Sequence, residues 1–282
     1  MKIHFKISYF TRWGQRLFVT GNVPALGNGD FSKALALNFK NSEDWVGEFD
    51  FNVDDRTEIL YNYIMFDEHT GRFTEEWGEK RSLLFENRIT EHFFCFDQWN
   101  SPDQVENTFL TAPFAEVLLR DEHEITLAEK NPKCTHIFKV KAPIIHGNQV
   151  VCVIGDCKAL GNWSTANPLL LNKSVDGYWQ IGVDLSKVQG DAHYKYGLYD
   201  PEDGKFYNFE TGPDRIAPIM NSKKTIVQLN DGFIRVPSQS WRGAGVGLPV
   251  FSIRTKKSFG AGDFGDMILF IDWAAKVGLK LI

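Results

Sequence analysis

The chain has 282 residues, a formal net charge of −5 and a hydrophobic content of 43%. These values exclude a collagen-like or globally disordered chain. A sequence pI near 5.8 argues against a nucleic-acid-binding surface, and no apolar run approaches the roughly 20 residues that a membrane span requires. The four cysteines follow no metal-ligand spacing, so we expect free thiols in a reducing cytoplasm, with no metal and no cofactor.

An internal repeat organises most of the sequence. The segment LFVTGNVPALGN at 17–28 is echoed by VCVIGDCKALGN at 151–162. Further landmarks recur at nearly the same offset: Trp45 with Trp179, Tyr61 with Tyr194, and Gly71 with Gly204. Two copies of one module therefore fill most of the chain.

Each copy is predicted to consist of short strands. Residues 45–53 and 178–185 alternate apolar with mostly polar side chains, which is the period of a half-buried strand. Turn-forming Gly, Asn and Asp residues separate such runs. This pattern predicts immunoglobulin-like β-sandwiches at 1–100 and 134–235, with the repeated tryptophans in their cores.

The segment between the copies, 101–133, is predicted to be a helical linker. Pro113 suits the first turn of a helix, and apolar residues recur at helical spacing: Phe109, Phe114, Val117 and Leu118.

The last segment, 236–282, follows a different pattern. It predicts a buried strand at 245–253, a glycine-rich loop, a helix over 263–277 and the start of another strand at 279–282. This is the opening of a βαβ unit. Since a lone strand and helix cannot cover their own apolar faces, we expect the chain to be a piece of a longer protein.

Three motifs of the second copy occur together: LGNW at 160–163, YKY at 194–196 and FETGPDR at 209–215. In combination they resemble the family 20 carbohydrate-binding modules, which are starch-binding sandwiches appended to amylolytic enzymes. The resemblance implies that this copy binds α-glucans such as maltose, maltooligosaccharides, starch and glycogen.

The resemblance also implies roles for individual residues. Trp163 would stack on a glucose ring, and Lys195 would hydrogen-bond sugar hydroxyls. Phe209 with Glu210 would complete the platform, near Asp214. Phe replaces the family's usual Trp at 209 and Asp replaces its Asn at 214, which predicts a reduced affinity.

Physical chemistry supports the same interpretation. Pyranose rings present apolar C–H faces to aromatic planes, while their hydroxyls need donors and acceptors. The alternative is that Trp163 and Phe209 belong to the core. An aromatic directly after a Gly-Asn turn is better placed on a rim, which favours binding.

The first copy departs further from this pattern. Gly29 stands where the stacking tryptophan is expected, and Asn62 stands where the lysine is expected. Trp77, beside two glutamates, is the one aromatic retained near the platform. It either holds a single glucose ring or packs against the module.

The final segment resembles the start of the 4-α-glucanotransferases of glycoside hydrolase family 77, through WRGAGVGLPV at 241–250, SFGAGDFG at 258–265 and FIDW at 270–273. The resemblance implies the first strand and helix of a (β/α)₈ barrel with a retaining mechanism. It places Phe259 and Asp263 in a loop at the mouth of the active-site cleft. The family's catalytic carboxylates are absent here, so we expect no catalytic residue in this chain and no transfer by it alone.

Two alternatives remain. GAGDFG at 260–265 matches a dinucleotide fingerprint, but six residues separate it from the preceding strand, where the fingerprint requires none. A non-catalytic α-glucan-binding scaffold is the more serious rival. Two starch-binding modules ahead of a transferase domain resemble the plant-type disproportionating enzymes. The hypothesis is therefore the N-terminal region of a cytoplasmic 4-α-glucanotransferase, which moves glucosyl or maltooligosyl units between α-1,4-glucans.

Overall fold

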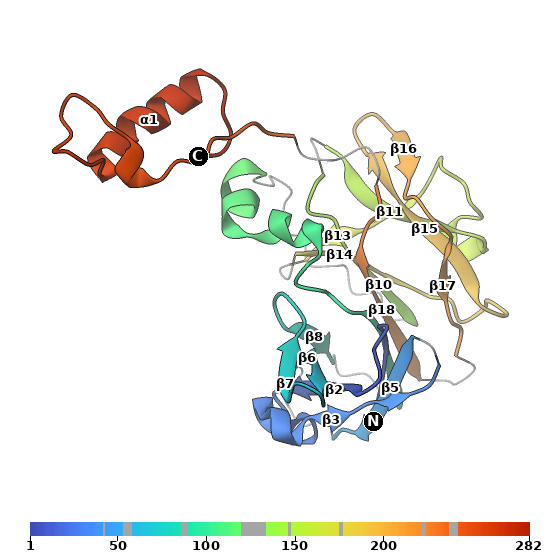
Figure 1. The fold of residues 1–282 in the computed structure, drawn as a ribbon. Coiled ribbons are helices and arrows are strands. Elements are labelled where there is room, and N and C mark those ends of the chain that lie inside the picture. The colour runs from blue at the N-terminus through green and yellow to red at the C-terminus, as the bar shows by residue number, and fades with distance from the viewer. Residues whose placement is uncertain are drawn as a thin grey trace.

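The computed structural model describes residues 1–41, 43–52, 58–85, 90–119, 134–145, 148–174, 177–220, 224–236 and 242–282. Within these residues the chain is mainly β, and the strands of each repeat form two facing sheets (Figure 1). Trp45 and Trp179 are 6% and 2% exposed, so the prediction that both lie in the cores is confirmed.

The first copy forms a sandwich. One sheet contains β1 (Lys2–Ser8), β4 (Asn38–Phe39), β5 (Asp44–Asp50) and β9 (His92–Gln98). The facing sheet contains β2 (Gln15–Gly21), β3 (Leu35–Ala36), β6 (Glu58–Asp67), β7 (Arg72–Glu75) and β8 (Arg81–Leu84). Two short helical turns, η1 (Pro24–Gly29) and η2 (Phe31–Lys33), follow β2.

The second copy repeats this plan. One sheet contains β10 (His136–Lys141), β13 (Asn172–Lys173), β14 (Tyr178–Val183) and β18 (Thr225–Phe233). The facing sheet contains β11 (Val150–Gly155), β12 (Leu169–Leu170), β15 (Ala192–Asp200), β16 (Lys205–Phe209) and β17 (Arg215–Ala217). The turn η5 (Lys158–Leu160) follows β11.

The two copies share one continuous sheet, which sequence analysis did not predict. β9 and β18 pair in parallel, from Thr225 opposite His92 to Asn230 opposite Asp97. The result is an eight-stranded sheet in the order β13-β14-β10-β18-β9-β1-β5-β4. The modules therefore form one hydrogen-bonded body.

The sandwiches pack on opposite faces of the shared sheet. On β9, Phe93 and Cys95 lie in the first core, whereas Phe94 and Phe96 pack against the second. This follows from the alternation of side chains along a strand. Ile226 of β18 lies in the first core in turn. Each core is thus completed by a strand of the other copy.

A buried polar network crosses this junction. The Asp97 carboxylate accepts hydrogen bonds from the hydroxyls of Tyr61 and Tyr63, at 3.0 and 2.5 Å. Arg81 Nη1 lies 3.4 Å from the same carboxylate. Asn230, from the second copy, also donates its amide to Asp97. The polar centre of the first sandwich therefore includes a residue of the second.

The linker is helical only in part. Val105–Leu110 forms the 3₁₀ segment η3, and Pro113–Leu118 forms the π-helical segment η4. The rings of Phe109 and Phe114 meet edge to face across these turns, with centroids 5.5 Å apart. Residues 120–133 of the predicted linker lie outside the described residues.

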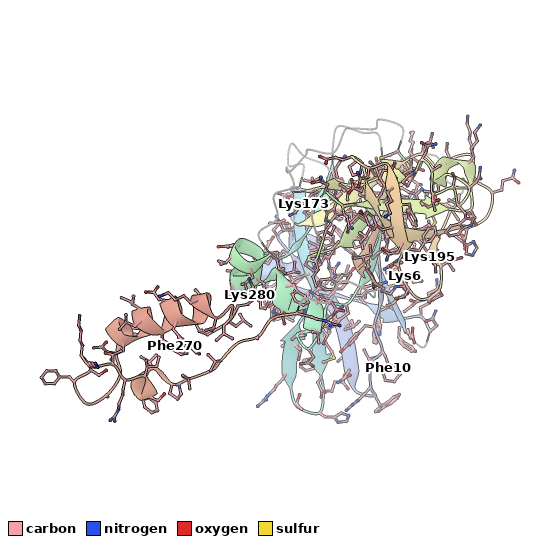
Figure 2. All side chains as sticks on the ribbon, turned by 90° about the horizontal axis from the view of Figure 1, so that it is seen from above. Lys6, Phe10, Lys173, Lys195, Phe270 and Lys280 are labelled. Atoms are coloured by element: carbon pink, nitrogen blue, oxygen red, sulfur yellow. The ribbon has the colours of Figure 1, made fainter. Side chains whose placement is uncertain are left out.

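The final segment confirms the predicted helix but not the predicted strands. The helix α1 spans Phe264–Lys276 and lies to one side of the sandwiches in both views (Figures 1 and 2). The strand prediction at 245–253 is wrong, because this stretch holds the 3₁₀ turn η6 (Val250–Ser252) and a single parallel bridge from Gly245 to Leu281. The predicted strand at 279–282 is reduced to that same bridge. A strand needs neighbours to pair its backbone groups, and this segment has no sheet to join among the described residues. No helix in the described ranges is long and apolar enough to cross a membrane.

The buried polar network around Asp97 allows a test of whether the two copies share one core. Asn230→Asp sets a second carboxylate against Asp97 in a site where residue 230 is 3% exposed, so we expect a loss of about 3 kcal/mol in the free energy of unfolding. The same substitution at exposed Asn38 should change stability by less than about 0.5 kcal/mol. Urea unfolding monitored by fluorescence measures both variants. Equal stability of the two variants would mean that the copies do not share this core.

Candidate functional site

Three residues predicted to bind sugar lie together on the outer face of the second copy. Lys195 on β15 points outward, because its neighbours Tyr194 and Tyr196 fill the core, and it is labelled in Figure 2. Trp163 follows η5 and is 36% exposed. Its ring centroid lies 6.3 Å from that of Phe209 on β16, at 75°. The pair forms an aromatic edge.

A second ring supports this edge. Phe206, also on β16, lies 4.7 Å from Phe209 by ring centroids. Gly197 on β15 leaves the space for it, because a Cβ there would come within 2.7 Å of the Phe206 ring. Sequence analysis missed Phe206, although the aromatic pattern of KFYNF at 205–209 was a visible signal.

The backbone presents Trp163 at a conformational cost. Asn162 and Trp163 both adopt left-handed conformations, with φ of 49° and 59°, and follow Gly161 at 82°. The first copy has the same turn with glycine, Gly29 at 84°, in the position of Trp163. Left-handed backbone is unfavourable for a bulky residue, and such strain concentrates at functional sites. The second copy thus retains a tryptophan where the turn itself favours glycine.

Lys195 is anchored beside the rings. Its Nζ donates to the carbonyl of Gly212 at 2.8 Å and lies 3.6 Å from Asp214 Oδ1. The Asp214 side chain is 46% exposed. An ammonium and an exposed carboxylate therefore stand next to an aromatic edge, which provides both donors and acceptors for hydroxyl groups.

Glu210 is placed differently from the other predicted residues. It is 2% exposed, and its two oxygens accept hydrogen bonds from Arg215 Nε and Nη2 at 2.7 and 2.8 Å. It also accepts from the backbone N–H of Tyr196 at 3.1 Å. Burial raises the pKa of Glu210, but the hydrogen bonds and the charge of Arg215, together with the hydrogen bonds from the Tyr196 N–H and Arg235, hold the pKa below its usual value. We assign Glu210 to positioning β15 and β16 rather than to contact with a ligand.

The first copy does not rebuild the platform from the corresponding residues. Asn62, in the place of Lys195, donates its amide to exposed Glu75, which stands in the place of Phe209. Trp77 is partly buried, and its backbone N–H and C=O are both paired with Asn100. It follows Glu76, the counterpart of Glu210, and so does not occupy a platform position.

Two further aromatic residues of the first copy are prominent on its surface. Phe10 and Trp13, between β1 and β2, are 69% and 93% exposed. Sequence analysis did not single them out, since they belong to no repeated motif. They stand on the loop between β1 and β2, and the Trp13 carbonyl lies 3.2 Å from His69 Nε2 in the turn between β6 and β7.

The two predicted cleft residues lie in the final segment. Phe259 is fully exposed. Asp263 is the N-cap of α1, and its carboxylate accepts from the backbone N–H groups of Gly265 and Asp266 at 2.7 and 3.1 Å. Such a cap contributes about 1 kcal/mol to a helix. The observed role of Asp263 is therefore to begin the helix.

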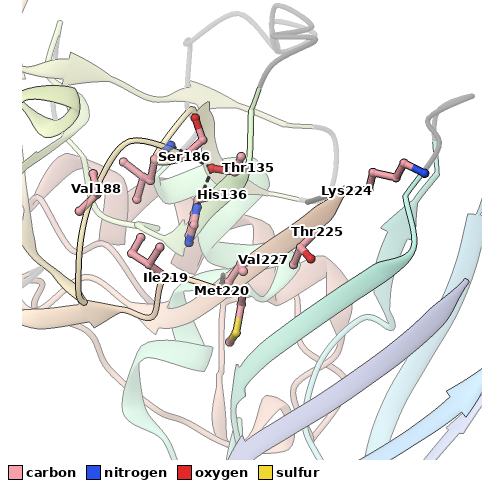
Figure 3. Close-up of a pocket in the computed structure, with 10 residues that line it drawn as sticks. Thr135, His136, Ser186, Val188, Ile219, Met220, Lys224, Thr225 and Val227 are labelled. Atoms are coloured by element: carbon pink, nitrogen blue, oxygen red, sulfur yellow. Dashed lines mark hydrogen bonds between the residues drawn. The ribbon is translucent and has the colours of Figure 1, made fainter. Parts of the chain in front are cut away.

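A cavity of about 420 Å³ lies beside the junction of the copies (Figure 3). His136 on its wall is already engaged, through Thr135 Oγ1 at 2.9 Å and the Pro218 carbonyl at 3.1 Å. The lining contains no aromatic ring of Phe, Tyr or Trp, so it offers no plane for stacking. Across the described ranges, no three His, Cys, Asp or Glu side chains gather as a metal site would require.

Comparisons with known proteins identify relatives of both copies. A family model described as "Starch binding domain" matches residues 1–92 and 133–228. A 4-alpha-glucanotransferase DPE2 of Oryza sativa subsp. japonica is 32% identical over 295 residues, covering 99% of this chain and 30% of that protein. The chain thus spans less than a third of that relative's length.

Solved structures with similar regions include a glucoamylase and a module of an amylase. The glucoamylase of Hypocrea jecorina is 26% identical over 36% of this chain and 17% of its own, with a TM-score of 0.32. The family 20 module of a maltotetraose-forming amylase from Pseudomonas saccharophila is 18% identical over 35% of this chain and 98% of its own, with a TM-score of 0.30.

The left-handed turn predicts an unusual order of stability. Glycine is ordinarily less stable than alanine within a strand by about 0.5–1 kcal/mol. At position 163 both variants lose the ring, but Trp163→Gly also relieves backbone strain, so we expect it to be about 1 kcal/mol more stable than Trp163→Ala. Phe209→Gly and Phe209→Ala, on β16, should follow the ordinary order. Thermal unfolding of the four variants measures this, and the ordinary order at both positions would contradict the strain.

The assignment of Glu210 predicts a pH dependence. Because its pKa is lowered in the folded state, its contribution to stability is present above the unfolded pKa of about 4.3 and is lost as pH falls through the folded pKa. At pH 7, Glu210→Gln should cost about 3 kcal/mol. The difference from the unaltered protein should shrink below about pH 4.3, as measured by urea titrations from pH 3 to 7. A difference that is constant with pH would show that the Glu210 charge is unimportant.

Proposed function

Because the chain belongs to the family of starch-binding domains, CBM_20, we propose that it binds α-1,4-glucans through the platform of its second copy. The ligand class comprises maltose, maltooligosaccharides, starch and glycogen. The observation that carries this proposal is the exposed aromatic edge of Trp163 and Phe209 with Lys195 beside it.

Each part of the platform has a role toward a glucose ring. The aromatic edge takes the apolar C–H face of the sugar, where stacking and removal of apolar surface from water are favourable. Lys195 donates to one hydroxyl while Asp214 accepts from another. Glu210, held by Arg215, fixes the spacing of the two strands that carry Lys195 and Phe209.

A larger role concerns the protein to which this region belongs. The chain would serve as the glucan-binding N-terminal region of a retaining 4-α-glucanotransferase, with α1 as the first helix of its catalytic barrel. The match to the rice relative over 99% of this chain supports this assignment. The exposed apolar side chains of α1 also support it, since they need a covering partner: Phe264, Ile268, Leu269 and Trp273. The absence of a disulfide among the four cysteines, all of which lie in the described residues, suits a cytoplasmic location.

The rival remains a non-catalytic glucan-binding scaffold. The two candidates share the platform and differ in activity, because only the transferase would release glucose from maltose in the presence of a glycogen acceptor. The family's catalytic carboxylates have no counterparts in this sequence. The activity therefore has to be assayed on the full-length protein.

The platform predicts unequal effects of two tryptophan substitutions on binding. One aromatic ring stacked on one sugar contributes on the order of 1–3 kcal/mol, by analogy with nucleic-acid bases. Trp163→Ala should therefore weaken β-cyclodextrin binding about tenfold or more, since 1.4 kcal/mol is a factor of ten. Trp77→Ala should have a smaller effect, because Trp77 is partly buried and lies outside the platform positions.

Calorimetric titration of both variants shows whether Trp163 or Trp77 contributes more to β-cyclodextrin binding. Circular dichroism provides the control that each variant is folded. If Trp77→Ala abolishes β-cyclodextrin binding while Trp163→Ala leaves it intact, the platform has been placed in the wrong copy.

A further inference from the structure

A cluster of aromatic rings lies beside the platform position of the first copy, where the tryptophan and the lysine are replaced. Phe66 on β6 pairs across the sheet with Phe73 on β7, and their ring centroids lie 4.8 Å apart. Phe31, from η2 just after Gly29, reaches the same place and lies 5.7 Å from Phe73. The rings come from three elements and so form no repeated sequence motif.

Strand pairing places this cluster next to the position of the second copy's platform, because Glu75 and not Phe73 corresponds to Phe209. The Phe66–Phe73 pair corresponds to the pair of Tyr199 with Phe206, as judged from the pairing of β6 with β7 and of β15 with β16. In each copy a ring from the turn region lies near a ring of the edge strand, at 5.7 and 6.3 Å. In each copy a further ring contacts the edge-strand ring, Phe66 on Phe73 at 4.8 Å and Phe206 on Phe209 at 4.7 Å, although these two pairs occupy different positions in the strand register. The two copies therefore build aromatic clusters on the same face of the module from different positions.

The cluster is accessible and has polar groups beside it. Phe73 is 44% exposed, compared with 36% for Trp163. Glu75, two residues along the same face of β7, is exposed and accepts from Asn62. Beneath the rings, Ile64 is fully buried. An aromatic edge with an exposed carboxylate supplies the same two functions as the Trp163 platform, namely a stacking plane and a hydrogen-bond acceptor.

The shared sheet determines which way the two clusters face. The two sandwiches lie on opposite sides of this sheet, so their second sheets, which carry the clusters, are separated by it. Phe66 and Phe73 lie on the outer face of the first copy, because the alternating residues Tyr61 and Tyr63 fill its core. One short glucan therefore cannot occupy both clusters.

We propose that the first copy carries a second α-glucan site centred on Phe31 and Phe73, so that the protein binds two separate glucan chains on opposite sides. This inference rests on the proposed function of the second copy. Because the two sandwiches are joined by hydrogen-bonded strands, the two sites are held in a fixed relation, with no flexible linker to order on binding. A protein with this arrangement bridges neighbouring chains of a polysaccharide.

Calorimetric titration with β-cyclodextrin tests the second site. Trp163→Ala should lower the number of ligands bound per chain by one, and Phe31→Ala/Phe73→Ala should lower it by one as well. Trp13→Ala is the matched control, since it removes a more exposed aromatic of the same module and should leave the number unchanged. If the phenylalanine pair leaves the stoichiometry unaltered, or if Trp13→Ala lowers it instead, the second site is overturned. If the unaltered protein binds no β-cyclodextrin at all, the proposed function is overturned instead.

Two further measurements keep the test decisive. If the double variant is unfolded by circular dichroism, Phe73→Ala alone should still weaken the binding that remains in Trp163→Ala about tenfold, because this ring is on an edge strand. Light scattering of glycogen reports bridging directly. The unaltered protein should cluster glycogen particles, and Trp163→Ala or Phe73→Ala should bind glycogen without clustering it. Clustering that survives both substitutions would contradict two-sided binding.

Discussion

A buried arginine in each sandwich holds together the strands on which both candidate sites depend. Arg215 donates to Glu210 through two nitrogens and lies 3.4 Å from Asp231. Asp231 also accepts from Tyr194 and Tyr196, and burial raises its pKa despite the arginine. Arg81 makes the equivalent contacts in the first copy. Breaking a buried pair leaves an uncompensated charge, so these residues constrain the geometry of the strands that carry Lys195, Phe209 and Phe73 without touching a sugar.

The two copies have the same fold but carry different residues at the turn that presents the platform. The same left-handed turn presents a tryptophan in one copy and a glycine in the other, at φ of 59° and 84°. In the second copy the strained turn places a tryptophan side chain on the surface. In the first copy glycine adopts the same turn without strain, and Phe31 of the next helical segment supplies a ring instead. The parallel pairing of β9 with β18 adds a property that neither copy has alone, because it turns two small sandwiches into one body with two outward faces.

Much of the fold follows from local patterns in the sequence. The repeat, the alternation around Trp45 and Trp179 and the helix over 263–277 were all predictable, because periodicity reports which face of an element is buried. The pairing of β9 with β18 was not, since edge strands carry no signal for the partner they choose. The strand at 245–253 was mispredicted because an apolar run cannot show whether a sheet is present to receive it. Trp163, Lys195 and Phe209 could be brought together from motifs, whereas Phe31, Phe66 and Phe73 meet only through tertiary structure. The burial of Glu210 likewise required the contacts of Arg215.

The central claim is that an α-glucan stacks on Trp163 and Phe209 while its hydroxyls meet Lys195. A crystal structure of the protein saturated with β-cyclodextrin tests this most directly. The account predicts a glucose ring against the two aromatic rings, with a hydroxyl within hydrogen-bond distance of Lys195 Nζ. A saturated complex in which the sugar lies elsewhere on the second copy, with Trp163 and Phe209 free, would contradict it.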